Sequence, residues 1–380
     1  MGIQDLYKVI PKNQCIAYRL ADFEGMRFAV DISIFLYKTI RSCGSVRWVS
    51  YFIMLLCTLK KNKIRAVCIF DGPNPPPEKA REQKRRRDEN GKHLKRLADA
   101  ITMRNLLQDE YLIGDKSLPE DVINTCKNLI NPRKSIDFTI YSNTSDIIES
   151  LKSIIQKLEN QTIPITNVHK EMAKEIVELM GLHMIQADGE AEGLCASLAV
   201  KGYVDAVLTE DTDVLAYKTP LMIAFKDYKI SDEMVIGIHF DSLLEEMDLE
   251  ANEFRDLCIL LSCDYNDRVK GYPPDGKTHK KPISIGAKYA LTMIEEYRTL
   301  EIVEDHLEDA GPLIYPRCRE LFTPPPVDVS MMIPYNLEPD YKKLERFIED
   351  HGVTIGLEYI KNCYTHEVIL FDEETMSNSE

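Results

Sequence analysis

Residues 204–213 read Val-Asp-Ala-Val-Leu-Thr-Glu-Asp-Thr-Asp, a largely apolar run that leads directly into a group of acidic residues. A short apolar run of this kind is typical of a buried strand. The same pattern occurs at Phe28–Val30, which leads to Asp31, and at Ala66–Phe70, which leads to Asp71. Three separate strands are therefore predicted to end at carboxylates.

Helical segments are predicted between these strands, at Ser33–Arg41, Trp48–Lys61, Val168–Met180 and Glu190–Lys201. Alternating strands and helices predict an α/β fold with a central, mostly parallel sheet flanked by helices. Ligands of such folds bind outside the carboxyl ends of the strands. The acidic residues are expected at that edge.

Carboxylates gathered at one edge repel one another unless cations neutralise them. Their oxygens are the ligands that Mg²⁺ and Mn²⁺ prefer. Two such ions can activate a water, position a phosphodiester and stabilise the leaving oxygen. The predicted metal ligands are Asp31, Asp71, Glu190, Glu192, Asp211, Asp213 and Asp264.

Each acid also has an ordinary structural interpretation, because Asp after a strand often caps a helix or forms a turn. Glu190 by itself fits a solvated helix face. Two pairs, Glu190 with Glu192 and Asp211 with Asp213, are spaced i and i+2, so an extended segment would point both members the same way. This repetition favours a metal site. Three neighbours are predicted to have no metal role: Asp205, Glu210 and His183.

A strongly basic segment follows Asp71, with nine Lys or Arg residues and three acids in residues 79–96. A solvated helix face is the ordinary interpretation of such a run. Lys79 and Arg86 are seven residues apart and share one helix face, which could clamp a scissile phosphate. Two further predictions concern DNA contacts by Arg85 and Arg87 and base stacking by Tyr37, for which core packing is the alternative.

The chain of 380 residues has a formal net charge of -15, which argues against a nucleic-acid binder held by overall charge. Its ten cysteines contain no C-x-x-C pair, so zinc ligation has no support. No uninterrupted apolar run reaches about 18 residues, and the N-terminus does not resemble a signal peptide. No membrane partner and no secretion are expected.

Residues 72–166 differ in character from the strand-rich segments. Prolines at 73–77 precede a long basic helical stretch from Glu78 to about Gln108, and a polar segment follows. We expect an insertion that emerges from the sheet edge and is partly mobile. The polar, acidic tail after about Leu370 is expected to be disordered.

Taken in order, these segments resemble the flap endonucleases of the XPG-type 5′-nuclease family. The opening Met-Gly-Ile-Gln-Asp-Leu is similar to the family's N-terminus, with Asp5 where the family usually has Gly. The resemblance continues through Val30–Ser33, Phe70–Gly72, Ala187–Glu192, Thr209–Asp213 and Leu257–Tyr265. It covers residues 1 to about 350, and the middle insertion matches poorly.

The resemblance implies a PIN-like 5′-nuclease fold with a helical arch and a helix-two-turn-helix. It implies that the seven acids bind two Mg²⁺ ions, which Mn²⁺ can replace. Lys79 and Arg86 would approach the scissile phosphate, and Tyr37 would stack on the adjacent nucleotide. The duplex would be gripped, with K⁺, near Ser284, Gly286 and Lys288.

The resemblance also divides the chain. Residues 1–109 form the N-terminal nuclease region, 110–166 the arch insertion, 167–350 the internal nuclease region and 351–380 the tail. About a dozen residues separate Lys270–Tyr272 from Ser284–Gly286, where the family has a compact turn. Either the turn is intact with a loop bulged out, or the potassium site is lost. No C-terminal clamp-binding box is present, so sliding-clamp binding is not predicted.

The resulting expectation is a structure-specific 5′ flap endonuclease, with 5′→3′ exonuclease activity in addition, that acts on branched or flapped duplex DNA. The alternatives are a repair exonuclease or junction resolvase of the same superfamily, an RNA-directed nuclease, and an inactive DNA-binding scaffold. The expected location is the nucleus or another compartment where DNA replicates, a viral factory included.

Overall fold

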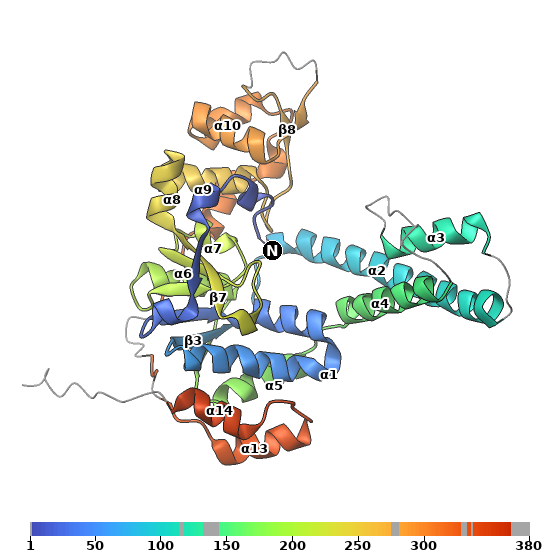
Figure 1. Ribbon diagram of the computed structural model, residues 1–380. Coiled ribbons are helices and arrows are strands. Elements are labelled where there is room, and N and C mark those ends of the chain that lie inside the picture. The colour runs from blue at the N-terminus through green and yellow to red at the C-terminus, as the bar shows by residue number, and fades with distance from the viewer. Residues whose placement is uncertain are drawn as a thin grey trace, which may run out of the picture. The chain divides into compact units, whose positions relative to one another are not determined.

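The computed structural model describes residues 2–113, 118–131, 144–274, 281–327, 333–335 and 337–365. The chain forms two compact units. Unit 1 contains residues 1–35, 50–78 and 171–380, and unit 2 contains residues 36–49 and 79–170. Figure 1 shows the elements of both units with their labels.

Unit 1 is built on a seven-stranded sheet with the order β1-β7-β6-β5-β2-β3-β4. The strands from β6 to β4 are parallel to their neighbours, whereas β7 is antiparallel to both β6 and β1. The strands are β1 Ile16–Arg19, β2 Arg27–Asp31, β3 Arg65–Phe70, β4 His183–Gln186, β5 Ala206–Leu208, β6 Leu221–Ala224 and β7 Met234–His239. The prediction of an α/β fold with a mostly parallel sheet is confirmed.

The order of the central strands creates a topological switch between β2 and β5. From β2 the chain proceeds through β3 to β4 on one side, and β5 and β6 lie on the other side. In doubly wound sheets, ligands bind at the carboxyl ends of the strands at such a switch. β2 ends at Asp31, and β5 leads to Asp211 and Asp213, so the fold itself brings these acids to the switch point.

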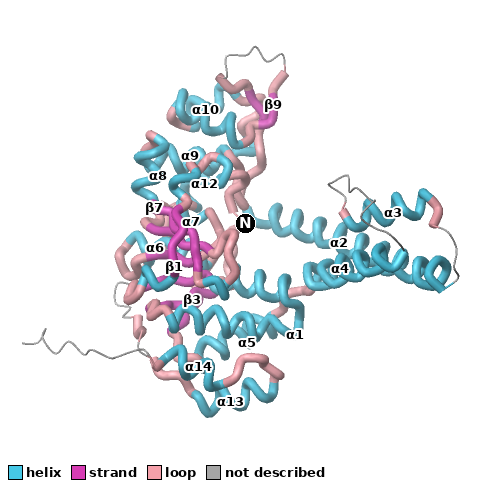
Figure 2. Tube along the Cα trace, viewed as in Figure 1, coloured by secondary structure: helices cyan, strands magenta, loops and turns pink. Residues whose placement is uncertain are grey.

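The strands are apolar because helices cover them, as Figure 2 shows. Phe28, Ala29 and Val30 of β2 and Val67 and Ile69 of β3 are completely buried. The helices of this unit, some shared with unit 2, are α1 Ile32–Lys61, α5 Asn167–Leu179, α6 Ala191–Val200, α7 Asp213–Ala216, α8 Phe240–Met247 and α9 Ala251–Leu260. Beyond them follow α10 Ala287–Tyr297, α11 Leu300–Val303, α12 Tyr315–Leu321, α13 Tyr341–Asp350 and α14 Leu357–Tyr364.

Helix α1 corresponds to the two helices predicted at Ser33–Arg41 and Trp48–Lys61. They are continuous except at Gly44, whose φ of 80° and ψ of 174° are not helical. By length and composition α1 could cross a membrane, although the sequence contains no uninterrupted apolar run of about 18 residues. However, 61% of its most apolar window is buried, as is typical of a core helix.

Unit 2 is helical and has an apolar cluster of its own. It contains α2 Ala80–Leu106, a π-helical turn at Leu107–Ile113, α3 Glu120–Ile130 and α4 Thr144–Thr162. Figure 1 shows α2 and α4 side by side. The expectation of a polar, partly mobile insertion missed α3 and α4, because their apolar residues are dispersed among polar ones. Ile147, Ile148, Leu151 and Ile155 of α4 lie on one face and are buried. Residues 114–117 and 132–143 of this insertion, and the tail from 366 onward, lie outside the described residues.

Candidate functional site

Asp31 is the last residue of β2 and the N-cap of α1, and only 2% of it is exposed. One carboxylate oxygen accepts a hydrogen bond from the hydroxyl of Thr209 at 3.0 Å. The other accepts a long bond of 3.4 Å from the backbone amide of Ile34. The capping interpretation of Asp31 is therefore confirmed, and its carboxylate also faces Thr209 after β5, whereas its role as a metal ligand stays a prediction.

Asp71 follows β3, and its position depends on the glycine after it. The Gly72 amide donates to the carbonyl of Gly189 at 2.7 Å, so the two segments cross in close contact. A Cβ at Gly72 would lie 2.1 Å from the carbonyl oxygens of Ala187 and Asp188, so no larger residue fits. The Asp71 carboxylate accepts a hydrogen bond of 2.9 Å from the Ala191 amide. The crossing thus places Asp71 beside the start of α6.

Glu190 is the N-cap of α6, and Glu192 lies in its first turn. Asp213 likewise opens α7, and Asp211 precedes it. The prediction that each pair lies in an extended segment is therefore wrong for Glu192 and Asp213. The pairs still share one region because both members of each lie at a helix N-terminus, where the helix dipole favours negative charge.

Tyr265 is a site residue that sequence analysis missed. Its hydroxyl donates a short 2.6 Å hydrogen bond to Glu190, although 75 residues separate the two. The ring is 1% exposed and packs against Phe322, with 5.4 Å between ring centroids. The only signal in the sequence was its position directly after Asp264. Tyr265 therefore fixes the position of one carboxylate oxygen of Glu190.

Asp213 is the most unusual acid of the group. It is 1% exposed, and neither of its carboxylate oxygens has a hydrogen-bond partner within the part of the chain that the structure describes. Its neighbour Asp211 accepts a bond of 3.1 Å from the Asp213 amide. A buried carboxylate without partners is costly, so a bound cation is the natural compensation.

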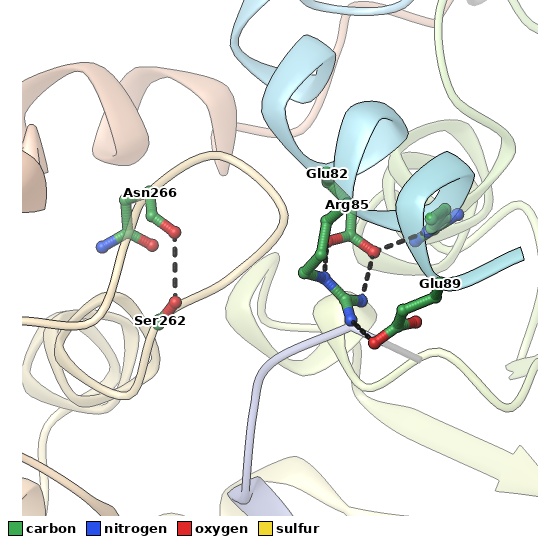
Figure 3. Close-up of polar contacts among 6 residues, drawn as sticks. Glu82, Arg85, Glu89, Ser262 and Asn266 are labelled. Carbon is green, nitrogen blue, oxygen red and sulfur yellow. Dashed lines mark hydrogen bonds and ion pairs between the residues drawn. The ribbon is translucent and has the colours of Figure 1, made fainter. Parts of the chain in front are cut away.

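Asp264 lies in a loop after α9 that is held by its own hydrogen bonds. The Ser262 hydroxyl donates to the Asn266 carbonyl at 3.0 Å, a contact drawn in Figure 3. The Asn266 side chain accepts from the Cys263 amide at 2.8 Å. Ser262 has a φ of 77°, which turns the chain sharply before Asp264. Asp264 is 9% exposed.

The acids influence one another electrostatically. Burial, and then the charges of Glu192, Asp71 and Asp211, raise the pKa of Asp31 well above its usual range. Burial, and then the charges of Asp211 and Asp264, raise the pKa of Asp213 in the same way. Six of the seven predicted metal ligands, all except Glu190, are thus linked electrostatically.

The donors fit a hard divalent cation. All are carboxylate oxygens, and those of Asp213 are buried and bare. Within the described ranges, no group of three or more Asp, Glu, His or Cys side chains is placed so that it could hold a metal ion. The seven acids are candidate ligands because of their chemistry, and Mg²⁺ takes only some of its ligands from protein and keeps several waters. His183 is the first residue of β4 and belongs to no such group.

The predicted basic residues lie in unit 2. Lys79 ends a 3₁₀ turn at Pro77–Lys79 and caps α2. Arg86 donates to Glu82 at 2.6 Å, and Arg85 binds both Glu82 and Glu89 at 2.6–2.7 Å. Figure 3 shows Arg85 between these two carboxylates.

Two other predicted DNA contacts also lie in unit 2. Tyr37, on α1, has the guanidinium of Arg41 over its ring at 5.8 Å. Arg87 lies on the exposed part of α2. The ring of Tyr37 is therefore at least partly engaged by a neighbouring cation.

The segment predicted to grip a duplex contains a short antiparallel pair, β8 Lys270–Gly271 with β9 Ile283–Ser284. The Ile285 amide also donates to the Val269 carbonyl at 3.0 Å. The two sides of the expected turn are therefore joined by backbone hydrogen bonds. Gly286 is the N-cap of α10, and Lys288 lies in its first turn. Residues 275–280 lie outside the described part.

Comparison with known proteins gives consistent results. The XPG N-terminal domain matches residues 1–92, and the XPG I-region matches residues 181–264. Flap endonuclease 1 of Drosophila mojavensis is 28% identical over 373 residues, covering 92% of this chain and 80% of the relative.

Two solved structures share the fold. The catalytic core of Rad2 in complex with a DNA substrate has a TM-score of 0.63 and 17% identity, covering 96% of this chain and 99% of the other. The Holliday junction-resolving enzyme GEN1, in complex with product DNA, Mg²⁺ and Mn²⁺ ions, has a TM-score of 0.52 and 15% identity, covering 92% and 72%.

Proposed function

The chain belongs to the XPG-type family of 5′ nucleases, and on that premise we propose that it is a divalent-metal-dependent 5′ flap endonuclease. The observation that carries the proposal is Asp213, a buried carboxylate with bare oxygens beside Asp211 at the switch point of the sheet. A protein that only scaffolds DNA gains nothing from mutually repelling buried acids. A nuclease needs them to hold its ions.

The acids have distinct roles in this proposal. Asp31, Asp71 and Glu192 would hold ions on the β2 and β3 side, and Asp211, Asp213 and Asp264 on the β5 side. Two Mg²⁺ ions, or Mn²⁺ in their place, supply water activation and charge neutralisation at a scissile phosphate. Glu190 is held in one orientation by Tyr265, so its remaining oxygen is pre-oriented.

The basic residues would act on the substrate. Lys79 and Arg86 would neutralise charge that develops on the phosphate in the transition state. Arg86 would then exchange Glu82 for a phosphate oxygen, which a guanidinium binds well. Arg85 and Arg87 would contact neighbouring phosphates, and Tyr37 would stack on a base.

Duplex DNA would bind at the turn near Ser284, Gly286 and Lys288. The support is the joined pair β8 and β9 and the start of α10, where backbone amides without a side-chain cap suit a phosphate. We propose that the protein acts where DNA is replicated, such as the nucleus or a viral factory.

The direct test is cleavage of a labelled 5′-flap duplex in Mg²⁺, with EDTA as the blank. A single cut near the junction that is lost in EDTA supports the proposal. Folded protein that cuts no flapped, nicked or blunt DNA in Mg²⁺ or Mn²⁺ would contradict it.

A junction resolvase or 5′→3′ exonuclease is the second candidate, because the fold is shared with GEN1 and Rad2 as well as with flap endonucleases. Flapped, blunt and four-way substrates, each at equal concentration, separate these activities. A flap made of RNA tests sugar preference in the same assay. Preference for the four-way junction would replace the flap assignment while leaving the metal site unchanged.

A further inference from the structure

Asp5 has an unusual backbone conformation for its residue type. Its φ of 61° and ψ of 10° lie in the left-handed region, which favours glycine. An aspartate there is strained, so other interactions must hold it in place. Asp5 also begins the short 3₁₀ helix Leu6–Lys8, so its conformation sets the direction of the N-terminal segment.

Two cations bind the Asp5 carboxylate. One oxygen pairs with Lys8 at 2.7 Å, within the same turn. The other pairs with Arg268 at 2.9 Å, and 263 residues separate these partners. Hydrogen bonds from Lys8 and then Arg268 lower the pKa of Asp5, so the pair is charged at neutral pH. The Lys8 contact is local, whereas the Arg268 contact joins two distant segments.

The N-terminal segment that Asp5 anchors contacts two loops that carry predicted metal ligands. Gly2 lies so close to the paired acids that a Cβ there would be 2.0 Å from an oxygen of Asp211 and 2.6 Å from one of Asp213. The Gln4 amide donates to the Ser262 carbonyl at 2.9 Å, at the start of the Asp264 loop. Residues 2–5 therefore lie between the two acid-bearing loops.

Arg268 also borders the predicted duplex-binding turn. Its guanidinium lies 3.9 Å from the position that a Cβ of Gly286 would occupy, at the start of α10. Its Nε is buried and has no partner among the described residues. Without Asp5, a partly buried guanidinium would lose its anion next to both the Asp264 loop and α10.

We propose that Asp5 and Arg268 are positioning residues of the metal centre, which hold residues 2–5 against the Asp211–Asp213 loop and thereby set the spacing between those acids and Asp264. This inference rests on the proposed function, because it assumes that these acids bind ions. Neither residue of the pair is proposed as a metal ligand. The pair acts on the position of the acids through the contacts of Gly2, Gln4 and Ser262.

The experiment measures Mn²⁺ binding by the complete chain, without DNA, by titration calorimetry. Asp5→Asn and Arg268→Gln each remove one charge, and Asn tolerates the left-handed conformation of Asp5. Each variant should weaken Mn²⁺ binding by about three- to tenfold, and the double variant no further, because one shared contact is lost. The matched control is Lys8→Ala, which removes the local partner and should change affinity less than about twofold.

The two single variants also exclude a simple effect of charge. If only the electric field mattered, Arg268→Gln would strengthen Mn²⁺ binding, because it removes a repelling cation, and Asp5→Asn would weaken it. The proposal requires that both weaken it. Opposite effects, additive losses in the double variant, or an equal loss in Lys8→Ala would overturn the proposal.

Cleavage of the flap substrate supplies a second readout. Turnover of Asp5→Asn and Arg268→Gln should fall at limiting Mg²⁺ and recover at saturating Mg²⁺, and Asp5→Asn, which removes no positive charge, should do so with unchanged DNA affinity. A loss that persists at saturating Mg²⁺ would contradict a role in ion positioning. If the unaltered chain binds Mn²⁺ and cuts DNA while the variants behave identically to it, only this inference fails. If the unaltered chain binds no Mn²⁺, the proposed function fails with it.

Discussion

The acids near the strand ends of unit 1 and those on the basic helix α2 of unit 2 differ in whether counter-charges lie beside them. On α2, Glu82 is held between Arg85 and Arg86. Although burial opposes it, these hydrogen bonds lower the pKa of Glu82. After β5, the Asp213 carboxylate has no hydrogen-bond partner among the described residues, and burial together with the charge of Asp211 raises its pKa.

This difference between a paired acid and a buried, unpaired one indicates where a cation would bind. The Glu82 side chain is only 10% exposed, yet its charge is satisfied because two arginines bind it. A buried acid beside other acids stays unsatisfied until a cation arrives, and it lowers the stability of the ion-free protein. Among the acids that the structure describes, Asp213 is distinguished by being buried with both carboxylate oxygens bare.

The largest effect is expected from removing the bare acid. Asp213→Asn should lower cleavage by about 10³-fold or more, because an ion loses a charged ligand. The ion-free variant should also be more stable, by roughly 1–2 kcal/mol, because a buried like charge is gone. Single-turnover cleavage and chemical denaturation in EDTA measure the two quantities.

Asp211→Ala together with Asp213→Ala should likewise abolish cleavage while DNA binding remains, and turnover close to that of the unaltered chain would rule out this site.

A smaller effect is expected on the basic side of the comparison. Lys79→Ala and Arg86→Ala should each lower single-turnover cleavage by about 10²-fold, because positive charge at the phosphate is lost. Arg104→Ala, in the last turn of the same helix, is the control and should have little effect. Equal losses in Arg104→Ala and Arg86→Ala would mean that the whole basic face acts through general attraction of DNA.

Tyr265→Phe tests whether orientation of an acid matters in addition to its charge. Loss of the hydroxyl that holds Glu190 should lower cleavage by about tenfold, with a weaker apparent affinity for Mg²⁺. Tyr335→Phe, which removes a hydroxyl bonded to the Tyr203 carbonyl, is the control. An unchanged Mg²⁺ dependence in Tyr265→Phe would reduce this tyrosine to a packing residue.

The smallest effect concerns a paired acid outside the site. Arg319 binds Glu301, and this contact lowers the pKa of Glu301 to about 2, from an ordinary value of 4.5. Because the folded-state pKa is lowered, the stabilisation is present above about pH 4.5 and is lost as the pH falls toward 2. The side chain of Glu301 is 52% exposed, so the contribution is only about 0.5 kcal/mol. In Glu301→Gln, the free energy of unfolding should fall by about 0.5 kcal/mol less between pH 4.5 and pH 2 than in the unaltered chain. An unchanged dependence of this free energy on pH would contradict the prediction.

The strand ends could be predicted from sequence because they depend on local patterns. The apolar runs before Asp31, Asp71 and Asp211 correspond to β2, β3 and β5, and the boundaries of α2 lie within a few residues of the prediction. The break predicted between the two halves of α1 corresponds to Gly44. These features need only neighbouring residues.

Contacts between distant segments could not be predicted. A buried tyrosine such as Tyr265 cannot be distinguished from an ordinary core residue until its partner, 75 residues away, is known. The pairing of Asp5 with Arg268 has the same origin. The helices α3 and α4 were missed for another reason, because a polar composition masked the helical spacing of their buried residues. The roles assigned to the site residues stay predictions until the experiments above are made.

The crossing at Gly72 has a consequence for the evolution of this chain. Any side chain at position 72 would push against the backbone of Ala187 and Asp188. Asp71 and Glu190 would then shift together, although they come from motifs more than a hundred residues apart. A single substitution at position 72 would therefore displace predicted metal ligands in both motifs. Only glycine is therefore tolerated at position 72, because the neighbouring backbone leaves no room for a side chain.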